Sequence, residues 1–319
     1  MKKSIILFIL FCVINNLNAQ TKTFHSNGKL KAIGFYGEKG HKKGEWKHYD
    51  LDGNLNEIGF FVNGEKEGEW KTFYKDTLTS LKNYKQSKKD GEWKYFYQNG
   101  KLKQIDHYID DEPTGTSKYF HKNGNLAYIR YYDNGKPIGE HKEYYESGKI
   151  KEATTFINGK TTSIKNYYES GGLSATKLLL KNKKIQAKSF YDDGSIGSVA
   201  YIENFKGWNP IGTVKHYHQN GKLHYKVKYS YTKTTRTKGY YANDKRKFKG
   251  YKKMLEHKGN YDMEPTGKWR FYYKNGKLKS VGNYSDGKQV GKWKYYTQKG
   301  KLQKIENWAN GKLVTTKNN

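Results

Sequence analysis

Residues 91–102 read Gly-Glu-Trp-Lys-Tyr-Phe-Tyr-Gln-Asn-Gly-Lys-Leu, and variants of this stretch recur along the chain. The Asn-Gly-Lys-Leu slot returns most regularly, at intervals of 23 to 32 residues that are mostly 23 or 24. An aromatic residue stands four positions before each of twelve slots, including two degenerate ones without the glycine, at Thr77 and Asp244. Self-similarity at a fixed period is the signature of a repeat protein, so the sequence predicts about twelve repeats.

Each repeat has the pattern of a β-hairpin. The slot glycine supplies the positive φ that tight hairpin turns require, and aromatic-rich stretches flank it on both sides. A second turn, such as Asn63-Gly64, leads to the next repeat. Because a short turn stands at both ends of each strand, neighbouring strands must be antiparallel. The glycines expected to shape the slot turns are Gly28, Gly53, Gly100, Gly124, Gly148, Gly171, Gly194, Gly221, Gly276 and Gly300.

Side-chain alternation predicts how thick this sheet is. Adjacent strand residues point to opposite faces, and Tyr144 and Tyr145 are adjacent, as are Phe96 and Tyr97. Both faces therefore carry aromatic residues, whereas a two-layer sandwich would have one apolar and one polar face. The predicted fold is all-β: an elongated, single-layer antiparallel meander of about twelve β-hairpins.

The composition agrees with an open sheet. Of the 319 residues, 34% are hydrophobic and 16% are aromatic, which is too aromatic for a disordered chain. The formal net charge of +31 raises nucleic acid, anionic lipid and acidic glycan as partners. Only four of the 61 basic residues are arginine, and bidentate phosphate or base recognition depends on arginine. Lysine spread evenly along every strand indicates a solvated face, so we expect no specific nucleic-acid binding.

The N-terminus has the form of a secretory signal peptide over residues 1–19. Lys2 and Lys3 precede an apolar run from Ser4 to Val13, and Ala19 provides a small residue for cleavage. The alternative is an uncleaved N-terminal anchor. We expect an exported protein in the periplasm, at the outer-membrane surface or outside the cell. The only cysteine, Cys12, lies in the apolar run, so the mature chain would have neither disulfides nor thiolate sites.

Residues 20–319 form the predicted repeat array, whose middle repeats have drifted from the pattern. One stretch, residues 245–259, is about eight or nine residues longer than its equivalents and includes Arg246-Lys247-Phe248-Lys249. The sequence predicts a basic surface loop or a short helix here, not a domain boundary.

No arrangement of catalytic, cofactor-binding or metal-binding residues stands out. His216 and His218 alternate onto one strand face and His224 lies across the turn, but a zinc site needs further ligands that the sequence does not supply. His218 and His121 occupy a position that is tyrosine in other repeats, so they are interpreted as substituted aromatics. The chain also lacks nucleophile, phosphate-loop and dinucleotide motifs. We therefore expect no enzyme, no cofactor and no metal.

Five tryptophans recur at one position of the repeat, seven residues before the slot. They are expected either to stack as a structural stripe between hairpins or to present a flat platform to a glycan or an apolar peptide. The candidate binding stripe is Trp46, Trp70, Trp93, Trp269 and Trp293.

The consensus Gly-x-Trp-Lys-x-Tyr/Phe-Tyr-x-x-Asn-Gly-Lys-Leu resembles the bacterial variant of the MORN repeat, over essentially the whole array. Proteins of this make-up resemble the YwqK-type antitoxin family. The resemblance implies a β-hairpin array with no catalytic site of its own and a protein as partner. We expect a non-enzymatic, exported scaffold that binds a protein along its sheet, in an antitoxin-like or immunity-like role. The alternative is a lysine-driven binder of anionic envelope polymers or of a membrane surface. An enzyme remains only if a site lies in the loop 245–259.

Overall fold

The computed structural model describes residues 20–205, 210–229, 234–257 and 260–319. The predicted signal peptide, residues 1–19, lies outside the described residues. The described residues form 28 β-strands and no helix, so they include no helix that could span a membrane. The chain divides into two compact units, Met1–Lys136 and Pro137–Asn319, which we call the N-terminal and C-terminal units.

The strands follow one another along each unit. The N-terminal unit contains β1 (Thr21–Phe24), β2 (Leu30–Tyr36), β3 (Lys42–Tyr49), β4 (Leu55–Val62), β5 (Glu65–Tyr74), β6 (Thr77–Lys85), β7 (Lys88–Lys89), β8 (Gly91–Phe96), β9 (Leu102–Ile109), β10 (Glu112–Pro113), β11 (Gly115–Phe120) and β12 (Leu126–Asp133). The two-residue strand β13 (Lys136–Pro137) spans the division. The C-terminal unit contains β14 (Gly139–Tyr144), β15 (Ile150–Ile157), β16 (Lys160–Tyr167), β17 (Leu173–Leu179), β18 (Ile185–Phe190), β19 (Ile196–Ile202), β20 (Pro210–Tyr217), β21 (Leu223–Lys228), β22 (Thr234–Tyr240), β23 (Arg246–His257), β24 (Asn260–Tyr272), β25 (Leu278–Ser285), β26 (Lys288–Tyr296), β27 (Leu302–Ala309) and β28 (Lys312–Asn318).

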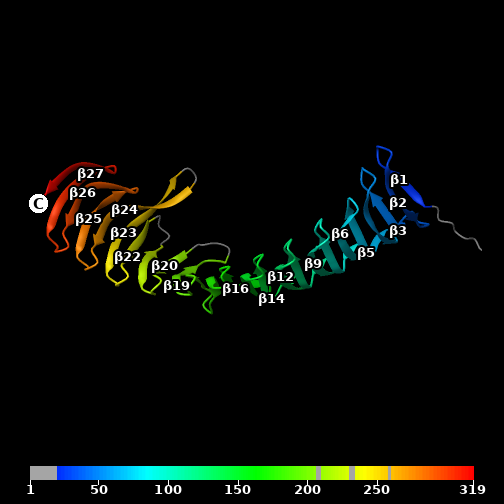
Figure 1. The fold of residues 1–319 in the computed structure, drawn as a ribbon, viewed down its shortest axis with the longest axis horizontal. Coiled ribbons are helices and arrows are strands. Elements are labelled where there is room, and N and C mark those ends of the chain that lie inside the picture. Colours follow the sequence, from blue (N-terminus) through cyan, green and yellow to red (C-terminus); the bar gives the residue numbers. More distant parts are fainter. Residues whose placement is uncertain (1–19, 206–209, 230–233, 258–259) are drawn as a thin grey trace, which may run out of the picture. The chain divides into compact units, whose positions relative to one another are not determined.

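The long strands pair in chain order and antiparallel, while the two-residue strands β7 and β10 extend β6 and β9, so β6 pairs with β8 and β9 with β11. In the N-terminal unit, for example, β3 pairs with β2 on one side and with β4 on the other. Figure 1 shows this succession of hairpins as a single layer of strands within each unit. The predicted all-β antiparallel meander of hairpin repeats is confirmed.

The slot turns are three-residue loops in which only the third residue needs a positive φ. In the first of them, Gly28 N donates to the carbonyl oxygen of His25, and His25 N donates to that of Lys29. Gly28 has φ 80°, while Asn27 stays in the ordinary negative range. This matches a type I turn followed by a left-handed residue, which glycine adopts without steric cost. All ten glycines expected in slot turns have positive φ.

The return turns are of a different kind. Asn63 and Gly64 have φ 51° and 85°, so both central residues are left-handed, as in a type I′ turn. The same geometry occurs without glycine at Asp110-Asp111, with φ 49° and 72°. Most strands are therefore bounded by a glycine-containing slot turn at one end and a more tolerant turn at the other, whereas β6 lies between two turns without glycine, Lys75-Asp76 and Gln86-Ser87.

The aromatic residue four positions before each slot marks a bulge. Thr23 pairs with Ala32, but the next residue, Phe24, pairs with Leu30, so the register shifts there. The same shift occurs beside the equivalent aromatic residue of all twelve hairpins. A bulge increases the local twist, so its regular recurrence twists the sheet uniformly.

In six repeats a tyrosine after this aromatic residue fastens the repeat to the next. The Tyr145 hydroxyl donates to the carbonyl oxygen of Tyr167 at 2.8 Å, and the Tyr168 hydroxyl to that of Phe190 at 2.7 Å. The acceptor in each case is the bulge-marking aromatic of the following repeat. Equivalent bonds are made by Tyr97, Tyr191, Tyr241 and Tyr273.

The core of the array is a tryptophan ring lying over a glycine of the preceding strand. A Cβ atom added at Gly59 would lie 2.1 Å from the Trp70 ring, and one added at Gly282 would lie 2.2 Å from the Trp293 ring. Gly34 and Trp46 form the same pair, as do Gly250 and Trp269. Real Cβ atoms do not approach a ring so closely, so glycine is required at these positions for space and not for φ.

The drifted repeats replace both members of the pair together. Val214 stands at the tryptophan position and Ala200 at the glycine position, with 1% and 0% of their surface exposed. In another junction, Ser117 replaces the tryptophan and donates to Asp106 at 2.6 Å. At these two junctions a smaller ring-position residue accompanies a larger glycine-position residue, which keeps the interior filled there.

The predicted basic loop over residues 245–259 is wrong. Residues 246–257 form β23, and β24 pairs with it from Phe248↔Phe271 to His257↔Asn260. The extra residues lengthen both strands of one hairpin equally, so they add ladder hydrogen bonds instead of an unpaired insertion. Residues 258–259 lie outside the described residues.

Substituting Gly59 by Ala should destabilise the protein, because its Cβ would overlap the Trp70 ring. Overpacking of this kind costs roughly 1–3 kcal/mol. Trp70→Val should also destabilise, by roughly 3–5 kcal/mol, because it leaves a cavity. The double variant Gly59→Ala/Trp70→Val copies the Ala200–Val214 pair and should cost less than the two single changes added together, as measured by thermal and denaturant unfolding.

Gly37→Ala is the matched control, because its Cβ would meet nothing closer than 3.8 Å and its φ is not positive. Strict additivity of Gly59→Ala and Trp70→Val would contradict the proposed ring-over-glycine contact.

Tyr145→Phe should lower the free energy of unfolding by about 1 kcal/mol, the usual contribution of one hydrogen bond. The change removes only the hydroxyl that reaches Tyr167. Tyr49→Phe, at the bulge position of another repeat, serves as a control for a tyrosine outside this series; an equal loss in both variants would argue against a bond between repeats.

Candidate functional site

The five tryptophans of the predicted binding stripe lie in the core. Their exposed fractions are 1, 0, 4, 4 and 2% for Trp46, Trp70, Trp93, Trp269 and Trp293. Neighbouring aromatic rings meet them edge-on; the ring centroids of Trp70 and Phe61, for example, lie 4.9 Å apart. Rings packed in this way offer no open platform to a glycan or a peptide. The five tryptophans therefore form a structural stripe between hairpins.

Lysine side chains cover the rings in the N-terminal unit. The Lys66 ammonium lies 3.8 Å from the centroid of the Trp70 ring, and that of Lys42 lies 4.3 Å from Trp46. Burial lowers the pKa of Lys42, and the neighbouring Lys66 lowers it further. These lysines act as part of the packing, with a cation–π contribution.

The opposite face of the N-terminal unit carries an alternation of lysine and aliphatic residues across the strands. Lys47 pairs with Ile33 and Ile58, and Lys71 pairs with Ile58 and Leu81. The alternation continues to Lys118 and Ile129. Lysines on this face are therefore separated from one another by an uncharged strand.

A glutamate two residues earlier balances many of these lysines. Lys47 lies 3.4 Å from Glu45, and Lys71 lies 3.5 Å from Glu69. Lys94 with Glu92 and Lys142 with Glu140 repeat the arrangement. The motif Gly-Glu-Trp-Lys thus places both charges side by side on the surface, where such pairs contribute little to stability.

In the C-terminal unit, five basic residues replace this alternation on five successive strands, β20 to β24. Lys215 pairs with Lys226, Lys226 with Lys238, Lys238 with Lys249, and Lys249 with Arg270. We call these five residues the basic ladder. Lys226 and Lys249 stand where the N-terminal unit has isoleucine or leucine. Like charges directly opposite each other destabilise a sheet, so the fold gains nothing from this row.

The balancing glutamates are also missing beside the basic ladder. Their positions hold Thr213, Arg236 and Lys268. Thr213, Lys228 and Arg236 line a hollow of about 320 Å³ together with three members of the ladder. Burial lowers the pKa of Lys238, and the cations around it, Arg236 first, lower it further.

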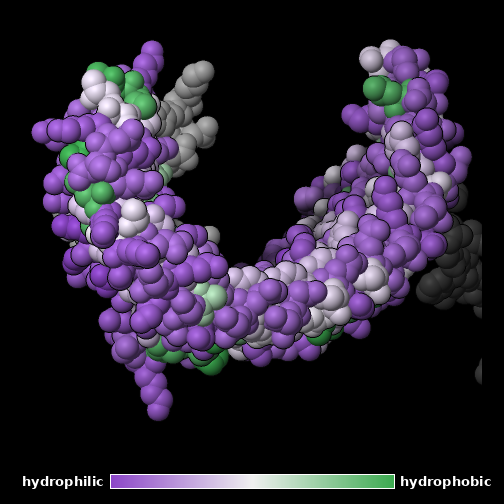
Figure 2. Space-filling view, turned by 60° about the vertical axis from the view of Figure 1, so that its left-hand side comes forward, coloured by the Kyte–Doolittle hydropathy of each residue, from purple (hydrophilic) through white to green (hydrophobic). Residues whose placement is uncertain are grey.

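Within the described residues, no member of the ladder has a carboxylate within 4.0 Å. The expectation of evenly spread lysine therefore describes the N-terminal unit but not β20–β24. Figure 2 shows a surface that is hydrophilic over most of the face in view.

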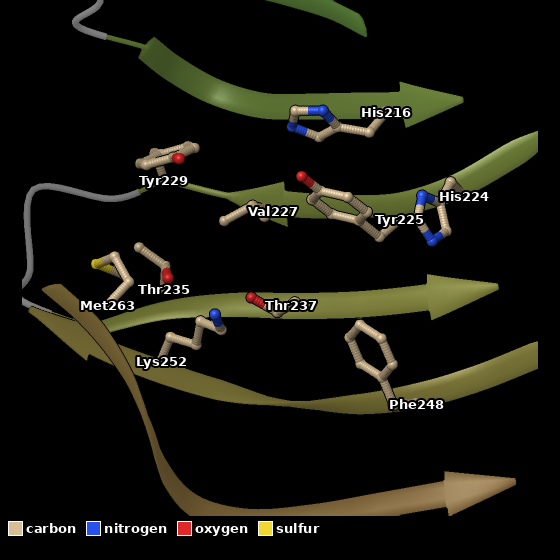
Figure 3. A pocket seen from close by; sticks show the side chains of 10 residues that line it. All are labelled: His216, His224, Tyr225, Val227, Tyr229, Thr235, Thr237, Phe248, Lys252 and Met263. Atoms are coloured by element: carbon tan, nitrogen blue, oxygen red, sulfur yellow. The ribbon is translucent and has the colours of Figure 1, made fainter. Parts of the chain in front are cut away.

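The other face of the same strands has a pocket of about 480 Å³ (Figure 3). It is bordered by His216, His224, Tyr225, Val227, Tyr229, Thr235, Thr237, Phe248, Lys252 and Met263. Thr235 and Thr237 are 5% and 3% exposed, and neither hydroxyl has a hydrogen-bond partner within the described residues. The pocket therefore combines aromatic walls with buried threonine hydroxyls that have no partner within the described residues.

The histidines of this region pack as aromatic rings. His216 stacks on Tyr225 with ring centroids 4.1 Å apart, and His218 lies 4.2 Å from His224. Burial lowers the pKa of His216, with a smaller contribution from His224. Across the described residues, no three His, Cys, Asp or Glu side chains come together as a metal site would require.

The basic ladder escaped the sequence analysis because its members belong to different repeats. Their alignment depends on the strand register, including a bulge at each hairpin. The sequence signal was nevertheless present: Lys226 and Lys249 align with aliphatic positions, and Arg236 and Lys268 align with the glutamate of Gly-Glu-Trp-Lys.

Comparisons with solved structures find only distant likenesses. The crystal structure of TcdB2-TccC3-TEV is 13% identical, with 92% of this chain and 18% of that chain covered and a TM-score of 0.17. The Tc holotoxin pore of Photorhabdus luminescens is 12% identical, with 89% and 18% covered and a TM-score of 0.18. A porin-like protein from Bacteroides uniformis is 9% identical, with 77% and 92% covered and a TM-score of 0.17. The chain spans about a fifth of the length of the Tc toxin chains. No curated protein matches the sequence.

The family comparison is decisive. The MORN repeat variant model matches eight segments: residues 17–37, 42–63, 89–110, 113–134, 137–158, 210–231, 265–286 and 289–310. The gaps include residues 159–209 and 232–264, where Ile164, Ala187 and Thr237 take the tryptophan position. Since the matched segments make up more than half of the chain and fall on the hairpins described above, the protein belongs to the MORN repeat variant family.

Proposed function

We propose that the protein is a non-enzymatic repeat scaffold that binds a linear anionic polymer along the basic ladder. The observation that carries the proposal is the row of five basic side chains on adjacent strands without balancing carboxylates. Repeats such as those of Lys47 and Lys71 separate and neutralise their lysines, whereas β20–β24 do neither, although this works against sheet stability.

The geometry of the row favours a linear partner. Neighbouring strands lie about 4.8 Å apart, so five charges span about 19 Å at right angles to the strands. A polyuronate carries one carboxylate per sugar, and its sugars advance by a distance close to this spacing. Four of the five members are lysine, which binds anions as a point charge without bidentate geometry. Recognition would thus depend on the spacing of charge more than on the identity of the sugar.

Export is part of the proposal. The positively charged and apolar N-terminus is typical of a signal peptide and would bring the array to the cell envelope, where acidic polymers are accessible. The proposal therefore includes both an acidic polymer as the partner and the cell envelope as the location.

The test uses polygalacturonate as the probe. Lys226→Ile/Lys249→Ile restores the alternation of the N-terminal unit, and Lys47→Ile/Lys71→Ile removes the same charge from balanced positions. Each ladder lysine should contribute about 1 kcal/mol, so the first pair should weaken binding roughly tenfold to hundredfold, and the control pair much less. Binding measured by calorimetry should fall steeply as salt is raised.

Equal losses in the two pairs would show that only net charge matters and would contradict the ladder proposal. So would failure of the full chain to bind polygalacturonate, or binding to anionic lipid vesicles alone.

The same Lys226→Ile/Lys249→Ile variant should be more stable than the natural chain at low salt. Each directly opposed like-charge pair costs roughly 0.2–1 kcal/mol, and the change removes all four such pairs. The difference in unfolding free energy should shrink as salt increases, because screening weakens the repulsion. A variant less stable than the natural chain at every salt concentration would contradict the repulsion within the ladder.

A second candidate is a protein partner on the N-terminal unit, including an antitoxin-like role with a toxin as partner. The observation that favours it is the exposure of two apolar side chains on one face of β4: Phe60 is 50% and Val62 is 44% exposed. Such a complex should survive high salt and be lost in Phe60→Ser/Val62→Ser. A partner retained by that variant would exclude this surface.

A further inference from the structure

Thr237 occupies the place of a tryptophan. It stands seven residues before its slot, at the position of Trp70 in β5 and Trp293 in β26. Its neighbour in β21 is Val227, at the position that Gly59 has beside Trp70. The pocket of the C-terminal unit lies around this position, so it corresponds to the room that an indole ring fills elsewhere in the array.

The walls of the pocket are those that a buried tryptophan normally meets. The Trp70 ring lies between Phe61 of the preceding strand, at 4.9 Å, and Tyr84 of the following strand, at 6.2 Å. The residues equivalent to Phe61 and Tyr84 are Tyr229 and Lys252. Tyr229 keeps the aromatic wall on one side of the pocket, while Lys252 replaces the aromatic ring on the other side with an ammonium group.

Figure 3 shows Thr237 between Tyr225 on one neighbouring strand and Phe248 and Lys252 on the other. Phe248 lies over Gly239, where a Cβ would be 2.2 Å from its ring, so its position is fixed by packing. The walls are thus largely formed before any ligand arrives, as in most small-molecule sites.

The charge at the border of the pocket adds a chemical requirement. Thr235 and Thr237 are buried, and their hydroxyl oxygens have almost no accessible surface, so they belong to the floor of the pocket and do not reach a ligand. Lys252 borders the same pocket, and its ammonium group would favour a ligand with a negative substituent.

We propose that this pocket binds a planar aromatic acid of about the size of indole. The ring lies between Tyr225, Tyr229 and Phe248, and its carboxylate meets Lys252. This site lies on the face opposite the basic ladder and is independent of the polymer-binding proposal.

The experiment uses the full chain and indole-3-carboxylate as the probe, with binding measured by calorimetry and ligand-observed NMR. Lys252→Met should weaken the probe at least tenfold and leave indole itself nearly unchanged. Lys253→Met is the control for Lys252→Met, because Lys253 is paired with Asp286 at 3.6 Å.

Val227→Gly/Thr237→Trp rebuilds the ring-over-glycine pair and fills the pocket from within. This variant should unfold at a higher temperature and bind neither indole nor its acid. Retained binding in a folded double variant would overturn the proposal, as would absence of binding to the natural chain. Binding of glucuronate but not of indole-3-carboxylate would also overturn it, since the pocket would then recognise a sugar. If the double variant fails to fold, the comparison of indole-3-carboxylate with indole in Lys252→Met decides alone.

Discussion

The structure depends on one contact, a tryptophan ring lying over the bare backbone of a glycine in the preceding strand. A single-layer sheet has no second layer to cover it, so each hairpin must bury its largest side chain against its own neighbour. Glycine allows the ring to approach the backbone plane, and the edges of Phe61 and Tyr84 close its sides around Trp70. The aromatic residues therefore replace the thick aliphatic core that the composition excludes. Bulges and tyrosine hydroxyls then hold the next hairpin in position.

This contact also explains how the array can vary. Where the ring is lost, its space must be filled from across the junction, as Ala200 does for Val214, or left open, as beside Thr237. A filled junction keeps only a structural role, whereas an open one becomes a pocket. The face opposite the rings is free of this constraint. Its charges can be balanced or concentrated without disturbing the core, which is how the same strands carry both a pocket and the basic ladder.

Most of the architecture could be predicted from the sequence, because the period, the turn glycines and the adjacent aromatic pairs are local signals. The basic ladder and the pocket could not be predicted from the sequence, because they depend on which residues of different repeats are paired. Lys226 and Lys249 are between 11 and 21 residues from their partners in the chain, and a bulge in each hairpin shifts the register that aligns them. The tryptophans looked equally suited to packing and to binding until their burial was known. The residues around Arg246 were interpreted as a loop because they exceed the repeat length, whereas they extend both strands of one hairpin.

The order of the strands also determines how a unit would respond to force. In the N-terminal unit the long strands follow one another across the sheet in chain order, and each is hydrogen-bonded to the long strands before and after it. A pull on the two ends of the unit acts along the hydrogen bonds and not across them. The hairpins would open one pair at a time, each at low tension, and re-form in reverse order. Such a unit behaves as an extensible tether that lengthens gradually, whereas sheets loaded along their strands resist and then fail at once.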